Sequence, residues 1–160
     1  MRKNIGQKFT IAVLAIFLSV LFALPVMAAG SWKQIVTRFS ATAGETLAVG
    51  NVVCIAGTDG KAYKADADDA NLRPAVGVIG KGGSTGATVE IVVTGILTGQ
   101  TARSPGARVF LSAATAGAIA GTAPANAQAL GFVMPGAAAA ATSTTYFIEV
   151  KMPESAGSAY

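Results

Sequence analysis

Short runs of β-branched and other apolar residues, separated by glycine, aspartate, asparagine and serine, recur after the N-terminal apolar segment. Residues 35–39 alternate, with Ile35, Thr37 and Phe39 on one side, which is the period-two pattern of a half-buried strand. Residues 52–55 form an uninterrupted apolar run, as in a strand that is covered on both faces. Apolar residues at helical spacing do not persist over three turns. The pattern therefore predicts an all-β fold.

Turn signals between these runs place the strands. Asp59-Gly60 is typical of a tight hairpin turn, because glycine adopts positive φ angles at little cost. Residues 62–64 would then form the returning strand. Five further runs have strand character: 75–79, 88–97, 108–111, 130–133 and 145–152. Strands spaced roughly ten residues apart predict a single compact β-barrel or β-sandwich of about 8–10 short strands.

The glycine and valine positions of the chain repeat weakly. The order of strand, glycine turn, strand, variable loop and glycine-led strand occurs twice. One copy contains Gly50, Val53, Ile55, Ala56, Gly60 and 77–79, and the other contains Gly106, Val109, Leu111, Ser112, Gly117 and 131–133. Such a repeat predicts two internally repeated halves that share a core. A composition rich in glycine, alanine and valine also produces chance matches, so the sequence leaves the duplication open.

Residues 1–28 have the composition of a secretory signal peptide. A basic start precedes an apolar stretch at 9–24, and small residues follow. Val26 and Ala28 suit the positions three residues and one residue before a cleavage site. We therefore expect cleavage after Ala28, and the next alanine is nearly as suitable.

Two alternatives to a cleaved signal stay open. The apolar stretch is slightly shorter than the roughly 20 residues that span a membrane, but an uncleaved N-terminal apolar helix would still act as an anchor. Cleavage after Gly6 would resemble the processing of pilin-like precursors and keep the apolar helix. Residues 7–19 lack the acidic residue that such a helix usually carries near its start.

Three segments are expected: the signal at 1–28, a β domain at 29–153 and a flexible tail at 154–160. The chain carries 12 basic and 8 acidic residues, for a net charge of +4. Three of the basic residues lie in the signal, so the remainder is almost neutral. Without a basic patch, nucleic-acid binding is not expected. Membrane contact is expected only through the N-terminal segment, if it is not cleaved.

The side chains of the common acid–base and nucleophilic sites are missing. The chain has no histidine and one cysteine, which excludes a Ser–His–Asp triad, a histidine-activated thiolate and the usual zinc sites. Glu90 and Glu149 fall at equivalent places in the two repeats, and both are expected on solvated strand faces. The glycine-rich segment 80–86 lacks the order of a phosphate-binding loop. Cys54 is expected to be a small buried hydrophobe, and a disulfide to another chain is the alternative. We predict neither enzymatic activity nor a cofactor.

The best candidate for a metal site is the acidic segment 66–71. Carboxylate and amide oxygens are the ligands that a hard cation such as calcium prefers, and they come from Asp66, Asp68, Asp69 and Asn71. Their spacing does not match the helix–loop–helix calcium motif. We interpret the segment as a solvated acidic loop, and a calcium site is the alternative.

Aromatic residues are few. Tyr63 and Phe110 are expected in the core. Trp32 follows the expected cleavage site closely. It would either anchor the start of the mature domain or contact another subunit, and the sequence does not choose between these roles.

A set of short, turn-rich motifs lies between residues 43 and 152: 50–53, 59–63, 73–78, 109–113, 117–119, 122–124 and 130–132. Together they resemble the capsid decoration, or cement, proteins of tailed phages and related virion β modules. The resemblance implies a compact β domain that oligomerises, often as a trimer, and binds a larger protein lattice without catalysis. The export signal departs from that family, whose members assemble in the cytoplasm.

Two functional hypotheses follow. The first is a non-catalytic exported structural protein that self-associates into a trimer or filament, or decorates a larger protein lattice. It would be secreted, periplasmic or at the cell surface, with a virion as the alternative location. The second is an exported monomeric module that binds a cation, a glycan or a protein through residues 66–71. Low net charge and free strand edges favour the first hypothesis.

Overall fold

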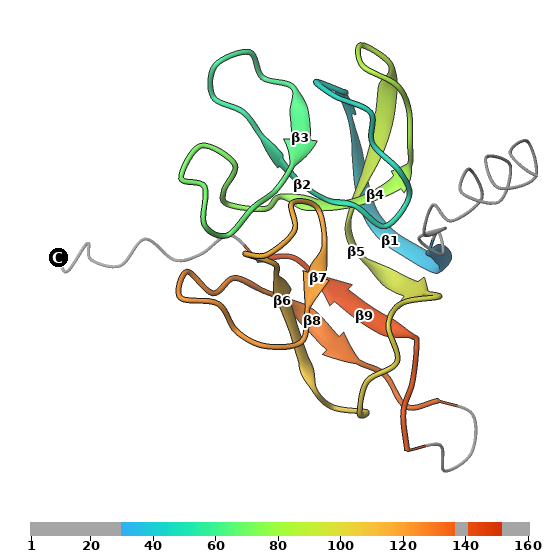
Figure 1. The fold of residues 1–160 in the computed structure, drawn as a ribbon. Helices are drawn as coiled ribbons and strands as arrows, with labels where there is room; N and C mark the ends of the chain where they lie inside the picture. The colour runs from blue at the N-terminus through green and yellow to red at the C-terminus, as the bar shows by residue number, and fades with distance from the viewer. Residues whose placement is uncertain (1–29, 137–140, 152–160) are drawn as a thin grey trace, which may run out of the picture.

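The computed structural model describes residues 30–136 and 141–151, which form one curled, half-barrel sheet of nine strands (Figure 1). Within these ranges there is no helix, so the predicted all-β class is confirmed. The strands are β1 (Ser31–Thr42), β2 (Val52–Ile55), β3 (Ala62–Lys64), β4 (Gly77–Lys81), β5 (Thr88–Thr98), β6 (Arg108–Leu111), β7 (Ile119–Ala120), β8 (Ala129–Val133) and β9 (Tyr146–Glu149).

The long strand β5 joins two lobes. The strand order is β3-β2-β4-β5-β9-β8-β6-β7, and β1 pairs with the other edge of β5. β4 pairs with residues 90–92 of β5, whereas β9 pairs with residues 94–97. We call β2, β3, β4 and the first half of β5 the first lobe, and β6 to β9 the second lobe. Figure 1 shows the first lobe above and the second lobe, in orange and red, below it.

The two lobes repeat one strand order. The strand order of the first is β3-β2-β4-β5, and that of the second is β7-β6-β8-β9. In each lobe, the first strand in sequence therefore lies between the second and the third. The register repeats as well, because Val53 pairs with Gly77 and Val109 pairs with Gly131. These are the pairs of positions that the weak sequence repeat relates to each other.

Most strand bounds agree with the sequence, and the differences are small. β3 and β6 match their predicted ranges, whereas β4 starts two residues late and β9 is shorter at both ends. β7 has only two residues, too few to give an alternating pattern. The hairpin between β2 and β3 exists, but its turn is wider than predicted. Ile55 pairs with Ala62, so residues 56–61 form the turn, and Gly60 takes its expected positive φ of 70°.

Strand β1 is longer and more exposed than its alternation predicts. Register shifts occur between Trp32 and Gln34 and on both sides of Thr37, and each shift breaks the period-two pattern. Ile35 is half-buried, but Thr37 is exposed and Phe39 is 40% exposed. The expected single buried face of this strand is therefore wrong.

The first lobe packs on both of its faces. Val53 belongs to a smaller apolar cluster with Ile79 and Ile91. Val52 and Cys54, on the other face of β2, belong to a larger cluster that extends into the second lobe. β2 is thus covered on both faces, as its continuous apolar run predicted.

Two predictions concern residues outside the described ranges: the signal at 1–28 and the tail at 154–160. In the described part of the chain there is no helix that is long and apolar enough to cross a membrane.

Candidate binding surfaces

The acidic segment uses its carboxylates to close its own loop. Asp66 Oδ1 accepts the N–H of Asp68 at 2.9 Å, and Asp69 Oδ1 accepts the N–H of Asn71 at 2.8 Å. Asp68 and Asn71 are exposed. Among residues 30–136 and 141–151, no three acidic or cysteine side chains converge as metal ligands. The four predicted ligands are therefore neighbours on one loop without a shared coordination centre.

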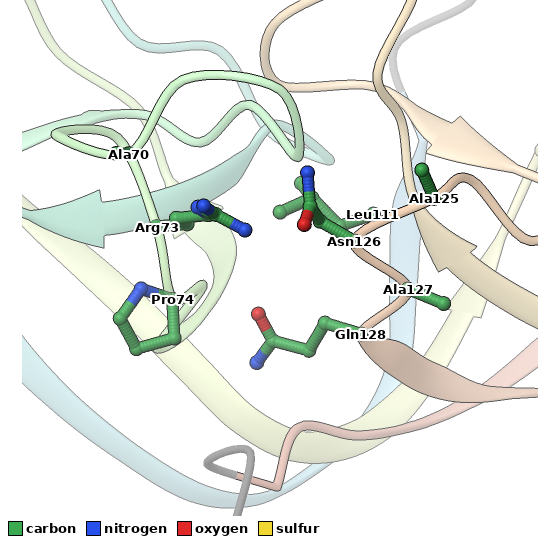
Figure 2. Close-up of a pocket in the computed structure, with 8 residues that line it drawn as sticks. All are labelled: Ala70, Arg73, Pro74, Leu111, Ala125, Asn126, Ala127 and Gln128. Carbon is green, nitrogen blue, oxygen red and sulfur yellow. The ribbon is translucent and has the colours of Figure 1, made fainter. Parts of the chain in front are cut away.

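Two open pockets share Ala70 and Arg73 as lining residues. The first has a volume of about 510 Å³ and is completed by Leu111 and residues 125–128. The second, of about 450 Å³, is completed by the β2–β3 turn, Tyr63 and Leu72. In Figure 2 the side chains of Arg73 and Asn126 point toward each other across the first pocket. A guanidinium facing a carboxamide suits an anionic group, because both can donate hydrogen bonds to it.

Gln128, on the wall of the first pocket, ties the lobes together. Its Oε1 accepts the N–H of Ala75 at 2.7 Å, and its Nε2 donates to the carbonyls of Ala75 and Lys151 at 2.8 and 3.1 Å. The side chain thus pairs with Ala75 as a neighbouring strand would. Nothing in the sequence pattern identified this residue, since a single glutamine before a strand carries no periodic signal.

Cys54 is buried, as predicted from its apolar run. Its Sγ–H donates to the carbonyl of Tyr63 at 3.7 Å. Burial raises the pKa of the Cys54 thiol, so the reactive thiolate is scarce at neutral pH. This cysteine is a packing residue of the first lobe.

Tyr63 and Asp59 fix the turn between β2 and β3. The Tyr63 hydroxyl donates to Asp59 Oδ2 at 2.8 Å, and Asp59 Oδ1 accepts the N–H of Lys61 at 3.1 Å. These hydrogen bonds lower the pKa of Asp59, and the bond from the Lys61 backbone has the largest effect. In turn, the hydrogen bond to the Asp59 carboxylate raises the pKa of Tyr63. Tyr63 is half-buried rather than a core residue.

Glu90 and Glu149 occupy different environments. Glu90 accepts a hydrogen bond from Arg38 at 2.9 Å in an exposed ion pair, and Glu149 lies 3.7 Å from the ammonium of Lys151. Their expected equivalence in the two repeats is wrong, because the strand register relates Glu149 to a different residue of β5. That residue is Thr94, which also pairs directly with Glu149. Val92 pairs with Val78 in the first lobe, and Phe147 pairs with Phe132 in the second, so Val92 and Phe147 are equivalent positions. Glu149, two residues beyond Phe147, is therefore equivalent to Thr94, two residues beyond Val92.

Trp32 anchors the start of β1, the first of its two predicted roles. Its indole N–H donates to the carbonyl of Ile79 at 3.0 Å. Its ring packs on the larger core cluster beside Gly95, where a Cβ would collide with it.

An aromatic face covers the outer side of the second lobe. A cross-strand row runs from Ile96 through Phe147 and Phe132 to Arg108. The two phenylalanine rings are 5.3 Å apart, and Phe132 is 42% exposed. Phe110, two residues beyond Arg108, is half-buried on the same face, so its expected core position is wrong. Alternation in the sequence could not show which face of these strands would stay uncovered.

No protein-family model and no curated protein sequence matches this chain.

Proposed function

We propose that this protein is a non-catalytic, exported structural subunit that associates with copies of itself or decorates a larger protein lattice or filament. The supporting observation is the aromatic face of the second lobe, because large apolar side chains gathered on one side of a sheet mark an interaction surface. The expected location is the periplasm, the cell surface or the medium, and a virion is the alternative.

The acidic groups support a structural role. Apart from Asp68, every carboxylate in the described ranges makes a hydrogen bond or an ion pair: Glu45, Asp59, Asp66, Asp69, Glu90 and Glu149. These interactions stabilise turns and strand pairs. In this proposal the two lobes are repeated halves of one barrel-like domain, and the repeated register of β2–β4 and β6–β8 supports that interpretation.

A monomeric binding module is the second candidate. The first pocket favours it, because Arg73 and Asn126 face each other across an open cavity. The preferred ligand would be an acidic glycan or an acidic peptide. Arg73→Ala would then abolish binding, while a calcium-dependent rise in melting temperature that is lost in Asp68→Ala would assign the site to residues 66–71.

The test of the main proposal uses the full chain expressed in a bacterial host. Mass spectrometry of the periplasmic fraction should find a chain that lacks residues 1–28, and light scattering should give a multiple of the single-chain mass. A protein that stays in the cytoplasm, or that is strictly monomeric at high concentration, would contradict the proposal.

A further inference from the structure

The aromatic face has a buried counterpart in the first lobe. Since the registers of the lobes repeat, Arg108, Phe110, Phe132 and Phe147 occupy the positions of Val52, Cys54, Val78 and Val92. All four residues of the first lobe are buried. Their second-lobe equivalents are exposed or half-buried. The same face of the same strand arrangement is therefore covered in one lobe and open in the other.

The connection after the second strand accounts for part of this difference. In the first lobe, residues 65–76 join β3 to β4 and contribute Ala65, Ala67 and Ala75 to the cluster that contains Val52. In the second lobe, the corresponding connection at 121–128 is shorter. Its alanines at 123, 125 and 127 are exposed and cover no strand face.

The charges beside the aromatic face are self-complementary. Arg108 continues the row beyond Phe132, and no ion pair of Arg108 occurs within the described ranges. Glu149 lies two residues beyond Phe147 on β9, and its pairing with Lys151 is exposed to solvent. A positive and a negative group thus flank the same apolar patch, as a surface that binds its own copy requires.

The free edge of β1 is a poorer site for association. Val36 on this strand is 63% exposed, but three register shifts twist the edge. Lys33 adds a positive charge to it, whereas Arg38 is already paired with Glu90, so the edge lacks the paired opposite charges of the aromatic face. Irregularity and charge are the features by which natural edge strands avoid pairing.

We propose that a second copy of this chain covers the aromatic face through a two-fold symmetric contact. This inference rests on the proposed function, of which it names the interface. Phe132 is at the centre of the contact, because it is the most exposed ring of the face. Arg108 of each copy lies beside Glu149 of the partner subunit. The second lobe thereby receives from its partner the cover that the first lobe receives from its own chain.

The test measures the dissociation constant of the full chain by sedimentation over a range of concentrations. Phe132→Asp should raise this constant at least about 30-fold, as loss of a central aromatic anchor does. Val36→Asp, on the edge of β1, is the matched control and should change it less than about threefold. Thermal melts of both variants should remain cooperative, which shows that the fold is intact.

A charge exchange tests the symmetry of the contact. Arg108→Glu and Glu149→Arg should each weaken association, and the double variant should restore it. A failure of the double variant to recover would contradict the proposed contact. If the wild type associates and Phe132→Asp does not weaken it, the interface is wrong and the structural function survives. If the wild type never associates, the proposed contact falls together with the self-association of the proposed function.

Discussion

The two lobes share a strand order and a register but differ in what covers them. In the first lobe, β2 and β4 each begin with three consecutive buried residues, so both faces of these strands are covered there. In the second, buried and more exposed residues alternate along β6, and β9 does the same. Strand topology therefore does not decide which faces become core. Side-chain size at equivalent positions, the length of one connection and the packing of the second lobe on the first all contribute to it.

Both lobes keep a glycine at equivalent register positions, Gly77 at the start of β4 and Gly131 in the middle of β8. A Cβ on Gly77 would collide with Ile91 and the carbonyl of Val92. Gly131 has a φ of 146°, and a Cβ there would collide with the carbonyl of Phe147. In both lobes the missing side chain lets the next strand approach closely.

Gly131→Ala should give the largest effect. We expect the free energy of unfolding to fall by about 3 kcal/mol, because the substitution adds a steric clash to an unfavourable φ. Gly77→Ala should be similar but smaller, since only the clash applies. Urea denaturation measures both. Gly57→Ala is the control, with no atom within 4 Å of its added Cβ, and a comparable loss there would refute the argument from close approach.

Gln128→Ala tests the link between the lobes. Removing the amide leaves the buried N–H and carbonyl of Ala75 without this partner, which should cost about 2 kcal/mol of unfolding free energy. The exposed Asn126→Ala, two residues away, should change stability by less than about 0.5 kcal/mol. Equal losses in the two variants would show that the Gln128 bonds do not stabilise the fold.

Val78→Ala and Phe132→Ala compare two equivalent positions. Val78→Ala removes the smaller side chain but should lower the free energy of unfolding more, by about 2 kcal/mol, because Val78 is fully buried in the core. Phe132→Ala removes the larger side chain but should lower the free energy of unfolding by only about 1 kcal/mol, because this ring is partly exposed to water in the folded chain. Urea titrations at low protein concentration exclude the contribution of association. The reverse order would contradict the assignment of covered and open faces.

The two hairpin turns should differ in their response to acid, which is the smallest expected effect. The first relies on the Asp59 carboxylate, whereas the second uses the neutral Ser112 hydroxyl, which accepts the N–H groups of Ala114 and Thr115 at 3.1 Å. The pKa of Asp59 is lowered from its ordinary 3.8. The stabilisation of the folded state by the ionised Asp59 carboxylate is therefore complete above pH 3.8, and it is lost as the pH falls through the pKa of Asp59 in the folded state.

Asp59→Asn should remove this part of the acid dependence. Unfolding by urea at pH 6 and at pH 3 measures it, with Ser112→Ala as the variant that should leave the dependence unchanged. An Asp59→Asn protein with the full acid sensitivity of the wild type would assign the effect to other carboxylates.

Strand positions could be predicted because their causes are local. The apolar run at 52–55, the Asp-Gly turn and the glycine-led strands all carry short-range signals, and the described strands follow them. The bulges of β1 could not be predicted, because they depend on pairing with β5, more than 50 residues away in sequence for most pairs. Nor could the role of Gln128, whose partners Ala75 and Lys151 are distant in the chain.

The candidate surfaces show the same limit. The acidic loop at 66–71 was identified from composition alone, but its carboxylates serve the loop itself. The aromatic face escaped prediction because an alternating strand has two faces, and the sequence does not say which one a distant segment will cover. Residues that cover this face of the first lobe come partly from the connection at 65–76, which has no strand pattern, and partly from the distant strands of the second lobe.

Thiol labelling at two equivalent positions tests the difference between the lobes most directly. Cys54 and a cysteine introduced as Phe110→Cys in a Cys54→Ala background would be compared by their rates of reaction with a soluble disulfide reagent. In dilute protein the cysteine at position 110 should react at least about 100-fold faster than native Cys54, and its rate should fall as protein concentration rises. Equal rates that do not depend on concentration would contradict the account.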